Sequence, residues 1–249
     1  MPEAKLNIKL LDKTDNALSI IYSACRQCYS AEFSGNIFEN SRREKNTEKI
    51  SSFVRKVIES GHESPLEHVK FTFAVEGVSR ALTHQLVRHR LASYSQQSQR
   101  YVKESHFDFI IPPSLRNDRE LNSRFLGIME LIQEGYNDLL GLLKTKGIQG
   151  EKANQDARFV LPQAAETKIV LTMNCRSLKN FFYHRCCARA QWEICALANA
   201  MLDICKKELP EVFGNAGAKC ENLGFCPEGQ KFTCGKYPPS AGSRREARG

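Results

Sequence analysis

Three basic side chains stand side by side in the segment RHRLASYSQQSQR, at Arg88, His89 and Arg90. Adjacent positive charges repel one another, so they are costly to order unless water or an anion screens them. The segment continues through serine and glutamine residues and ends at Arg100. Arginine forks bind phosphate oxygens, and serine and glutamine can satisfy the edges of a heterocycle. The mixture favours a nucleotide pocket.

A solvated basic face is the competing interpretation of the same segment. The pattern of residues 79–90 predicts a helix that would carry the triplet at its C-terminal end, where the macrodipole stabilises each cation by roughly 0.3–1 kcal/mol. A weak nucleic-acid patch would also be basic, although such patches usually hold roughly five to eight basic residues. No helix end requires the polar run from Ser93 to Gln99, so the alternatives stay open on this evidence.

A second group of polar side chains follows Arg176, where more than thirty residues without Gly or Pro predict a long helix. Arg176, Asn180 and His184 repeat at four-residue spacing, and Arg185 and Arg189 are one turn apart. A solvated helix face would give the same pattern. Arg185 differs because phenylalanine and cysteine residues surround it in sequence, and an arginine among apolar neighbours usually has an anionic or hydrogen-bonding partner.

The elements that must position these groups are predicted from hydrophobic periodicity. Strands are expected at 69–77 and 167–174, and helices at 47–60, 79–90, 118–144, 151–159 and from 176 onward. Strands mixed with long helices indicate an α/β fold of the α+β type, with a mixed sheet flanked by long helices. No linker divides the chain before about residue 214, which favours a single domain.

Composition adds limits on partners and location. The chain has 249 residues and a net charge of +8, which favours anionic partners, and part of that charge lies in the basic end SAGSRREARG, expected to be disordered. No apolar run approaches the roughly 20 residues of a membrane span, and the N-terminus lacks the apolar core of a secretory signal. We expect a cytoplasmic protein that binds no membrane.

Ten cysteines without an export signal indicate reduced thiols. Four lie at helical spacing among apolar residues and are expected to be packing residues: Cys186, Cys187, Cys195 and Cys205. Three more lie near the C-terminus: Cys220, Cys226 and Cys234. Their spacing lacks the paired C-x2-C ligands of zinc sites, so no metal is expected and their role stays open.

The segment RHRLASYSQQSQR resembles the signature of the flavin-dependent thymidylate synthases, in which seven residues separate Arg-His-Arg from a serine, here Ser98. Upstream, GHESPLEHVKFTF resembles the family's Gly-His-Glu-Ser/Thr-Pro block. Downstream, ARFVLP, MNCRSLKNFF and RAQWEI occur in family order. The resemblance covers about residues 20–213, which divides the chain into a catalytic domain at 1–213 and a Cys- and Gly-containing extension at 214–249.

The resemblance implies a mixed α/β homotetramer in which each active site forms where subunits meet. Members of the family carry FAD and convert dUMP to dTMP, taking the methylene group from 5,10-methylenetetrahydrofolate and reducing equivalents from NADPH. The implied FAD contacts are His62, Ser64, Arg88, His89, Arg90, Gln96, Asn174, Arg176 and Asn180. The implied dUMP contacts are Gln85, Arg88, Gln96, Ser98, Gln99, Arg100, Arg158 and Arg185.

The carried-over roles agree with the chemistry of the side chains. Arg100 and Arg158 can hold a phosphate bidentately while Ser98 donates a hydrogen bond to it. Arg185 is the expected catalytic residue, because a fixed guanidinium stabilises negative charge that develops on the uracil ring. Hydride transfer is chemistry that the reduced flavin supplies.

No protein nucleophile is expected. The other class of thymidylate synthase uses a cysteine in a Pro-Cys-His context, and no cysteine of this chain follows a proline. Gln96 and Arg189 depart from some members, which have Glu and His there, so the contacts of these two residues stay open. Two other classes of function also remain: a nucleic-acid-binding module, and an enzyme that methylates uracil in RNA with the same folate and flavin.

Overall fold

The computed structural model describes residues 3–240, so residues 241–249 of the basic end, expected to be disordered, lie outside the described residues. Two compact units divide the chain. Unit 1 comprises the N-terminal residues up to Lys9, Phe73–Arg88 and Ser93–Leu171; unit 2 comprises Leu10–Thr72, His89–Ala92 and the chain from Thr172 onward. No described helix is both long and apolar enough to cross a membrane.

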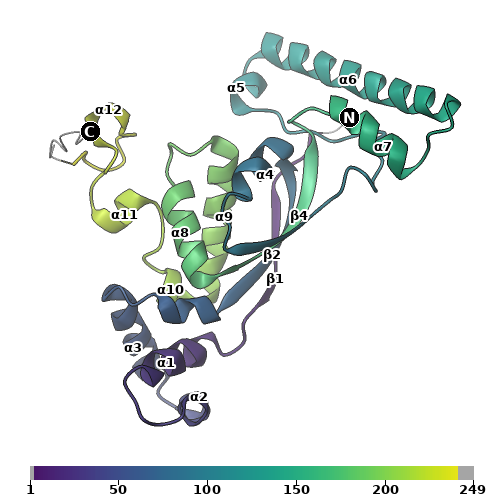
Figure 1. Cartoon of the computed structure of the whole chain (residues 1–249). Helices are drawn as coiled ribbons and strands as arrows, with labels where there is room; N and C mark the ends of the chain where they lie inside the picture. Colours follow the sequence, from purple (N-terminus) through teal and green to yellow (C-terminus); the bar gives the residue numbers. More distant parts are fainter. Residues whose placement is uncertain (1–2, 241–249) are drawn as a thin grey trace, which may run out of the picture. The chain divides into compact units, whose positions relative to one another are not determined.

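Within residues 3–240, four strands form one sheet in the order β1 (Asn7–Lys13), β2 (Lys70–Ser79), β4 (Glu166–Asn174) and β3 (Ala92–Gln96) (Figure 1). The strand predicted at 167–174 is confirmed as β4. That predicted at 69–77 is confirmed as β2, which extends two residues further.

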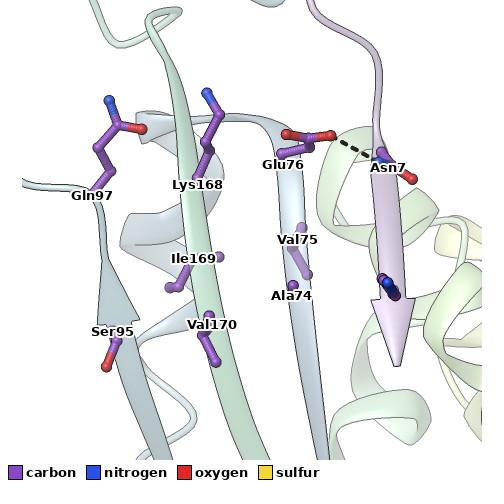
Figure 2. Close-up of a pocket in the computed structure, with 10 residues that line it drawn as sticks. Asn7, Ala74, Val75, Glu76, Ser95, Gln97, Lys168, Ile169 and Val170 are labelled. Atoms are coloured by element: carbon purple, nitrogen blue, oxygen red, sulfur yellow. Dashed lines mark hydrogen bonds between the residues drawn. The ribbon is translucent and has the colours of Figure 1, made fainter. Parts of the chain in front are cut away.

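The sheet is antiparallel, and the expectation of a mixed sheet was wrong. Thr72 hydrogen-bonds Thr172, whereas the Gly77 amide donates to Glu166, so the numbering of β4 falls as that of β2 rises. Figure 2 shows the same relation between β3 and β4. The alternating burial along β4 explains the difference, because strands with one buried face are typical of antiparallel sheets, whereas parallel sheets are covered on both faces.

Unit 1 contains the longest helix. Its helices are α4 (Arg80–Leu86), α5 (Pro113–Arg116), α6 (Arg119–Thr145), α7 (Glu151–Ala157) and the 3₁₀ turn η2 (Arg158–Val160). The helix predicted at 118–144 is confirmed as α6, which begins where the Asp118 carboxylate accepts hydrogen bonds from the amides of Glu120 and Leu121. A buried cluster packs beneath it, formed by Phe107, Phe109, Ile111, Met129 and Ala165.

Unit 2 is mostly helical. Its elements are α1 (Ala17–Gln27), α2 (Ser34–Arg43), α3 (Thr47–Glu59), η1 (Ser64–His68), α8 (Cys175–Arg185), α9 (Trp192–Glu208), α10 (Pro210–Phe213), α11 (Lys219–Leu223) and α12 (Gly229–Phe232). The helix predicted at 47–60 is confirmed as α3. Phe182 of α8 packs edge-on against Phe213, with ring centroids 6.0 Å apart, and Phe213 packs against Phe71 at 5.7 Å.

The single helix expected from Arg176 onward is two helices. α8 ends at Arg185 and α9 begins at Trp192, where the Gln191 side chain accepts hydrogen bonds from two amides of the first turn. Arg189 therefore lies in the connector 186–191 and not one helical turn beyond Arg185. No Gly or Pro marks the break between the two helices, which is set instead by Gln191, the N-cap at which α9 begins.

The basic triplet does not lie on a helix end. α4 ends at Leu86, so residues 88–90 belong to the connector that leads to β3. The helix predicted at 79–90 was therefore too long at its C-terminal end, and the triplet lies just beyond the cap of α4. The polar run that follows forms β3, which lies at the edge of the sheet.

Candidate functional site

The residues expected to bind dUMP lie almost entirely in unit 1: Gln85, Arg88, Gln96, Ser98, Gln99, Arg100 and Arg158. Arg185 is the exception and belongs to unit 2. α4 and β3 carry Gln85 and Gln96, and η2 begins at Arg158. The side chains of this group therefore come from α4, from β3 and the loop that follows it, and from η2, which lies much further along the chain.

Arg100 is held by its neighbours but keeps a donor without a partner. The Ser98 hydroxyl accepts a hydrogen bond from the Arg100 amide at 3.2 Å, and the Asn154 side chain donates to the Arg100 carbonyl at 3.0 Å. The guanidinium forms an ion pair with Glu151. Its Nε is buried and has no hydrogen-bond partner among the described residues. An unsatisfied buried donor on a cation is unusual. The part of the guanidinium that an anion could reach is its exposed end, which pairs with Glu151.

The positive charge around Arg158 is concentrated. Burial lowers the pKa of Arg80, and the charge of nearby Arg158 lowers it further, against the opposing effect of Glu104. The pKa of Glu104 is raised by its own burial and by the charge of Glu166. Two guanidinium groups close enough to perturb each other form an environment that a phosphate would stabilise.

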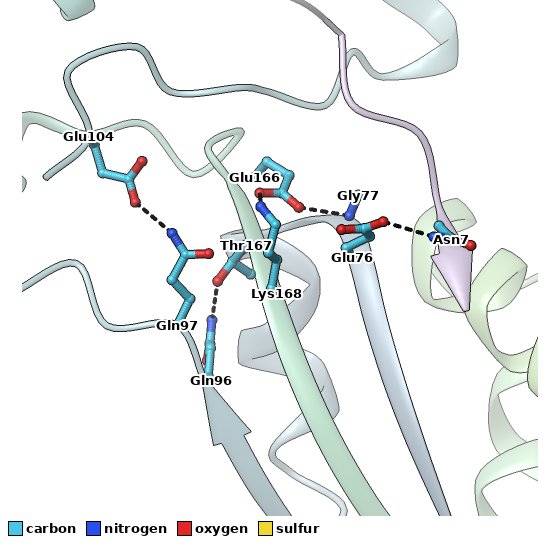
Figure 3. Close-up of polar contacts among 9 residues, drawn as sticks. All are labelled: Asn7, Glu76, Gly77, Gln96, Gln97, Glu104, Glu166, Thr167 and Lys168. Atoms are coloured by element: carbon cyan, nitrogen blue, oxygen red, sulfur yellow. Dashed lines mark hydrogen bonds and ion pairs between the residues drawn. The ribbon is translucent and has the colours of Figure 1, made fainter. Parts of the chain in front are cut away.

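Gln96 at the end of β3 and Gln97 just after it belong to a polar network at the ends of β3 and β4 (Figure 3). The Gln96 amide donates to the hydroxyls of Thr83 and Thr167, each at 3.2 Å. The Gln97 amide donates to the Glu104 carboxylate at 3.3 Å. These contacts fix the side-chain orientation of Gln96, the residue whose departure from some family members left its contacts open.

One cavity of unit 1, about 530 Å³, lies away from these residues (Figure 2). Alternate residues of the exposed sheet face line it, among them Ala74 and Val170, with Glu76 and Lys168 as charged members. None of the predicted site residues lines this cavity.

The residues expected to bind FAD lie mostly in unit 2: His62, Ser64, His89, Arg90, Asn174, Arg176 and Asn180. Arg88 and Gln96 belong to unit 1. η1, which begins at Ser64, packs against α8, which begins just after Asn174. The Asn174 side-chain oxygen caps α8 by accepting a hydrogen bond from the Ser177 amide at 2.8 Å.

Two carboxylates pair with cations on the surface formed by η1 and α8. Arg176 pairs with Glu67, and Lys179 pairs with Glu63. Both glutamates lie in the GHESPLEH segment, but the sequence alone did not assign them a role. Exposed donors at His62 and on α8 suit an anionic pyrophosphate, which prefers arginine, amide and hydroxyl donors. The residues of this surface therefore fit FAD.

Arg185 and His89 contact each other within unit 2. Arg185 Nε donates a hydrogen bond to His89 Nε2 at 3.1 Å. The His89 ring lies edge-on to Phe181, with centroids 4.9 Å apart. Burial, with the charges of Arg185 and His184, lowers the pKa of His89 to about 4. His89 is therefore neutral near pH 7 and orients the guanidinium without neutralising its charge.

Burial deactivates several of the thiols. All ten cysteines, each of them within residues 3–240, are free. Burial raises the pKa of Cys25 to about 11 and that of Cys186 to about 12, and it also raises the pKa of Cys175 and Cys205. No group of three or more His, Cys, Asp or Glu residues in the described part of the chain is placed to hold a metal ion. Buried, protonated thiols are poor nucleophiles.

Comparison with known proteins identifies the family. The family model for thymidylate synthase complementing protein matches residues 9–211. A flavin-dependent thymidylate synthase of Nitratidesulfovibrio vulgaris is 55% identical over 239 residues, covering 96% of this chain and 98% of the relative. Proteins of the same name from Clostridium tetani and Pyrococcus abyssi are 49% and 42% identical, covering 93% and 90% of this chain and 94% and 90% of the relatives. The chain therefore belongs to the thymidylate synthase complementing protein family and, like these flavin-dependent thymidylate synthases, is an enzyme.

Proposed function

We propose that the protein converts dUMP to dTMP, with 5,10-methylenetetrahydrofolate as the carbon donor and FAD reduced by NADPH as the source of hydride. The observation that carries the proposal is the contact between Arg185 and His89, because it holds a fully charged guanidinium in one orientation. A preorganised cation stabilises negative charge that develops in a transition state. The names of the relatives support the reaction.

The flavin would be held by the donor-rich surface of η1 and α8. Arg90, Arg176 and Asn180 would bind its anionic part, together with the hydroxyl of Ser64. When bound, the flavin supplies the hydride, while the protein orients it and excludes competing reactions. Arg176 would exchange its contact with Glu67 for the ligand, since one guanidinium can satisfy either anion.

The nucleotide would be held through its phosphate by Arg100 and Arg158, with Ser98 as a further donor. The phosphate would replace the Glu151 carboxylate, which pairs with Arg100 in the structure. Other contacts from unit 1 would come from Gln85, Arg88, Gln96 and Gln99. Arg185 would act at the uracil ring, where its charge stabilises the negative charge that develops at N3 and the neighbouring carbonyl.

No cysteine is proposed as a nucleophile. Attack on uracil by a thiol requires a thiolate, and burial raises the pKa of Cys175, Cys186 and Cys205. The ten free thiols also suit a reducing compartment, which supports a cytoplasmic location.

Self-association as a homotetramer, with active sites where subunits meet, belongs to the same proposal. Support comes from α6, where Leu131 and Leu142 are 66% and 63% exposed and further leucines on the helix are also exposed. Apolar side chains gathered on one helix are typical of a surface that binds a partner. Light scattering at micromolar concentration tests this: a tetramer mass is expected, and a monomer would contradict it.

A substrate comparison tests the reaction against its two rivals. The purified holoenzyme is incubated with the folate and NADPH and either dUMP or a uracil-containing RNA, and the methylated product is quantified. We expect methylated product from dUMP and none from the RNA. Methylation of RNA would instead identify an RNA uracil methyltransferase. Salt-sensitive binding of polynucleotide without bound flavin or turnover would indicate a nucleic-acid-binding module.

A further inference from the structure

The residues beyond α10 pack against the connector that follows Arg185. We call residues 219–237, which include α11 and α12, the C-terminal segment. Arg189 of the connector forms an ion pair with Glu228 of this segment, and its guanidinium carbon lies 4.6 Å from the centre of the Phe232 ring. A cation that both pairs with a carboxylate and stacks on a ring is held in a defined position.

Glu228 joins two cations. Its Oε1 lies 3.3 Å from Lys219 Nζ, and its Oε2 contacts Arg189. Burial raises the pKa of Glu228, but the contacts with Lys219 and Arg189 outweigh it, so the net effect is a lowered pKa and a charged carboxylate. Only 23% of the Glu228 side chain is exposed, which screens these contacts less than those of a fully exposed pair.

Lys219 of the C-terminal segment contacts residues that precede Arg185 in the chain. Its Nζ lies 5.8 Å from the centre of the Tyr183 ring in α8. Burial lowers the pKa of His184, and the charge of Lys219 lowers it further. The C-terminal segment therefore contacts residues on both sides of Arg185 in the chain, through Lys219 before it and through Glu228 and Phe232 after it.

The C-terminal segment is held together by contacts of its own. Lys236 pairs with Glu221 at 2.5 Å, and the Cys226 amide donates to the carbonyl of Pro238, the residue just after the segment, at 2.7 Å. Cys187 of the connector lines a small apolar cavity with three cysteines of the segment, Cys220, Cys226 and Cys234. The four cysteines therefore lie together where the segment meets the connector.

We propose that the C-terminal segment positions Arg185 for catalysis, with Glu228 and Phe232 acting through Arg189. The inference rests on the proposed function, because it assigns Arg185 the role of stabilising charge on the substrate. The side chain of Arg185 is oriented by His89, and its backbone is fixed at the end of α8 by the anchored connector. A misplacement of about 1 Å at a catalytic group can cost roughly 100-fold in rate.

Kinetics of single substitutions test the inference. Glu228→Lys places three cations together, Glu228→Gln removes the charge, and Phe232→Ala removes the ring. Gln230→Ala, an exposed residue of α12, is the matched control. We expect kcat per bound flavin to fall roughly ten- to hundredfold in Glu228→Lys and less in the other two, with the dUMP KM within about threefold of wild type and the control unchanged.

Two further measurements separate positioning from loss of folding. The exchanged pair Arg189→Glu with Glu228→Arg restores the attraction between these two positions but not the contacts with Lys219 and Phe232, so kcat should recover in part and exceed that of Glu228→Lys. In an Arg185→Ala background, Glu228→Lys should have no additional effect on residual turnover, because the group that it displaces is absent.

Exchange of backbone amide hydrogens gives a measurement that does not depend on enzymatic turnover. Amides of residues 183–191 should exchange faster in Glu228→Lys and in Phe232→Ala than in wild type and Gln230→Ala. Unchanged exchange in this stretch, or unchanged kcat in an active wild-type background, would overturn the inference. An inactive wild-type enzyme would instead refute the proposed function, while the exchange data would still report on the contact between the segment and the connector.

Discussion

Replacing Arg185 by alanine tests the electrostatic role of its guanidinium. The substitution removes the charge assigned to the substrate and the 3.1 Å hydrogen bond to His89. Loss of one preorganised donor to a developing oxyanion typically costs about 2.7–4 kcal/mol, which is a factor of about 10²–10³ in kcat. We therefore expect turnover to dTMP to fall by at least 100-fold.

The assay separates catalysis from cofactor binding. Product formation is followed under saturating substrates, and bound flavin is measured by its absorbance after gel filtration. Flavin should remain bound, because Arg185 is not among the proposed FAD contacts. Arg185→Lys is the matched control: it keeps the charge but loses the planar guanidinium, so its kcat should lie between those of wild type and the alanine variant.

Two results would contradict the role assigned to Arg185. If Arg185→Ala kept kcat within about threefold of wild type, no transition-state stabilisation could be assigned to the guanidinium. If flavin were lost in the alanine variant, the reduced turnover would report on cofactor binding, and the assignment of Arg185 to the nucleotide alone would be wrong.

Further predictions concern the phosphate group and the buried imidazole. Arg158→Ala should raise the dUMP KM roughly 10- to 100-fold with little change in kcat, since hydrogen bonds to charged groups contribute about 1.5–3 kcal/mol; an unchanged KM would remove Arg158 from the phosphate site. Glu151→Gln frees Arg100, so the dUMP KM should fall up to about fivefold, given that exposed ion pairs contribute up to about 1 kcal/mol; a higher KM would show that Glu151 aids binding. The His89 ring should titrate near pH 4 by NMR, because its pKa is lowered. Arg185→Ala should raise that midpoint, since it removes a neighbouring positive charge. A midpoint near 6.5 in the wild-type protein would contradict the assigned environment. Because the pKa of His89 in the folded state lies below about 6.5, its contribution to the free energy of unfolding is present above pH 6.5 and is lost as the pH falls toward 4.

The parts of the fold that could be predicted have strong periodicity. The helices at 47–59 and 119–145 and the strand at 166–174 each carry a regular apolar pattern, because each packs one face against a core. β1 and β3 could not be found in this way. β3 has the sequence ASYSQ and lies at the edge of the sheet, where no second strand or apolar face constrains its residues.

The chemistry of the site was readable from residue types, but the pairing of its residues was not. The signature indicated Arg100 and His89, yet their partners Glu151 and Arg185 lie 51 and 96 residues away in sequence. Arg189 shows the same limit, because its partner Glu228 lies in the extension beyond the family signature. Contacts of this kind depend on tertiary packing, which no local pattern records.

The most direct test of the account is formation of dTMP from dUMP, 5,10-methylenetetrahydrofolate and NADPH under low oxygen, comparing flavin-stripped protein with the same protein after FAD is restored. The account predicts no product from the stripped protein and turnover once FAD is added. Equal product in both preparations would contradict a flavin-dependent reaction, and no product from folded, FAD-loaded protein would contradict the assignment of dUMP as the substrate.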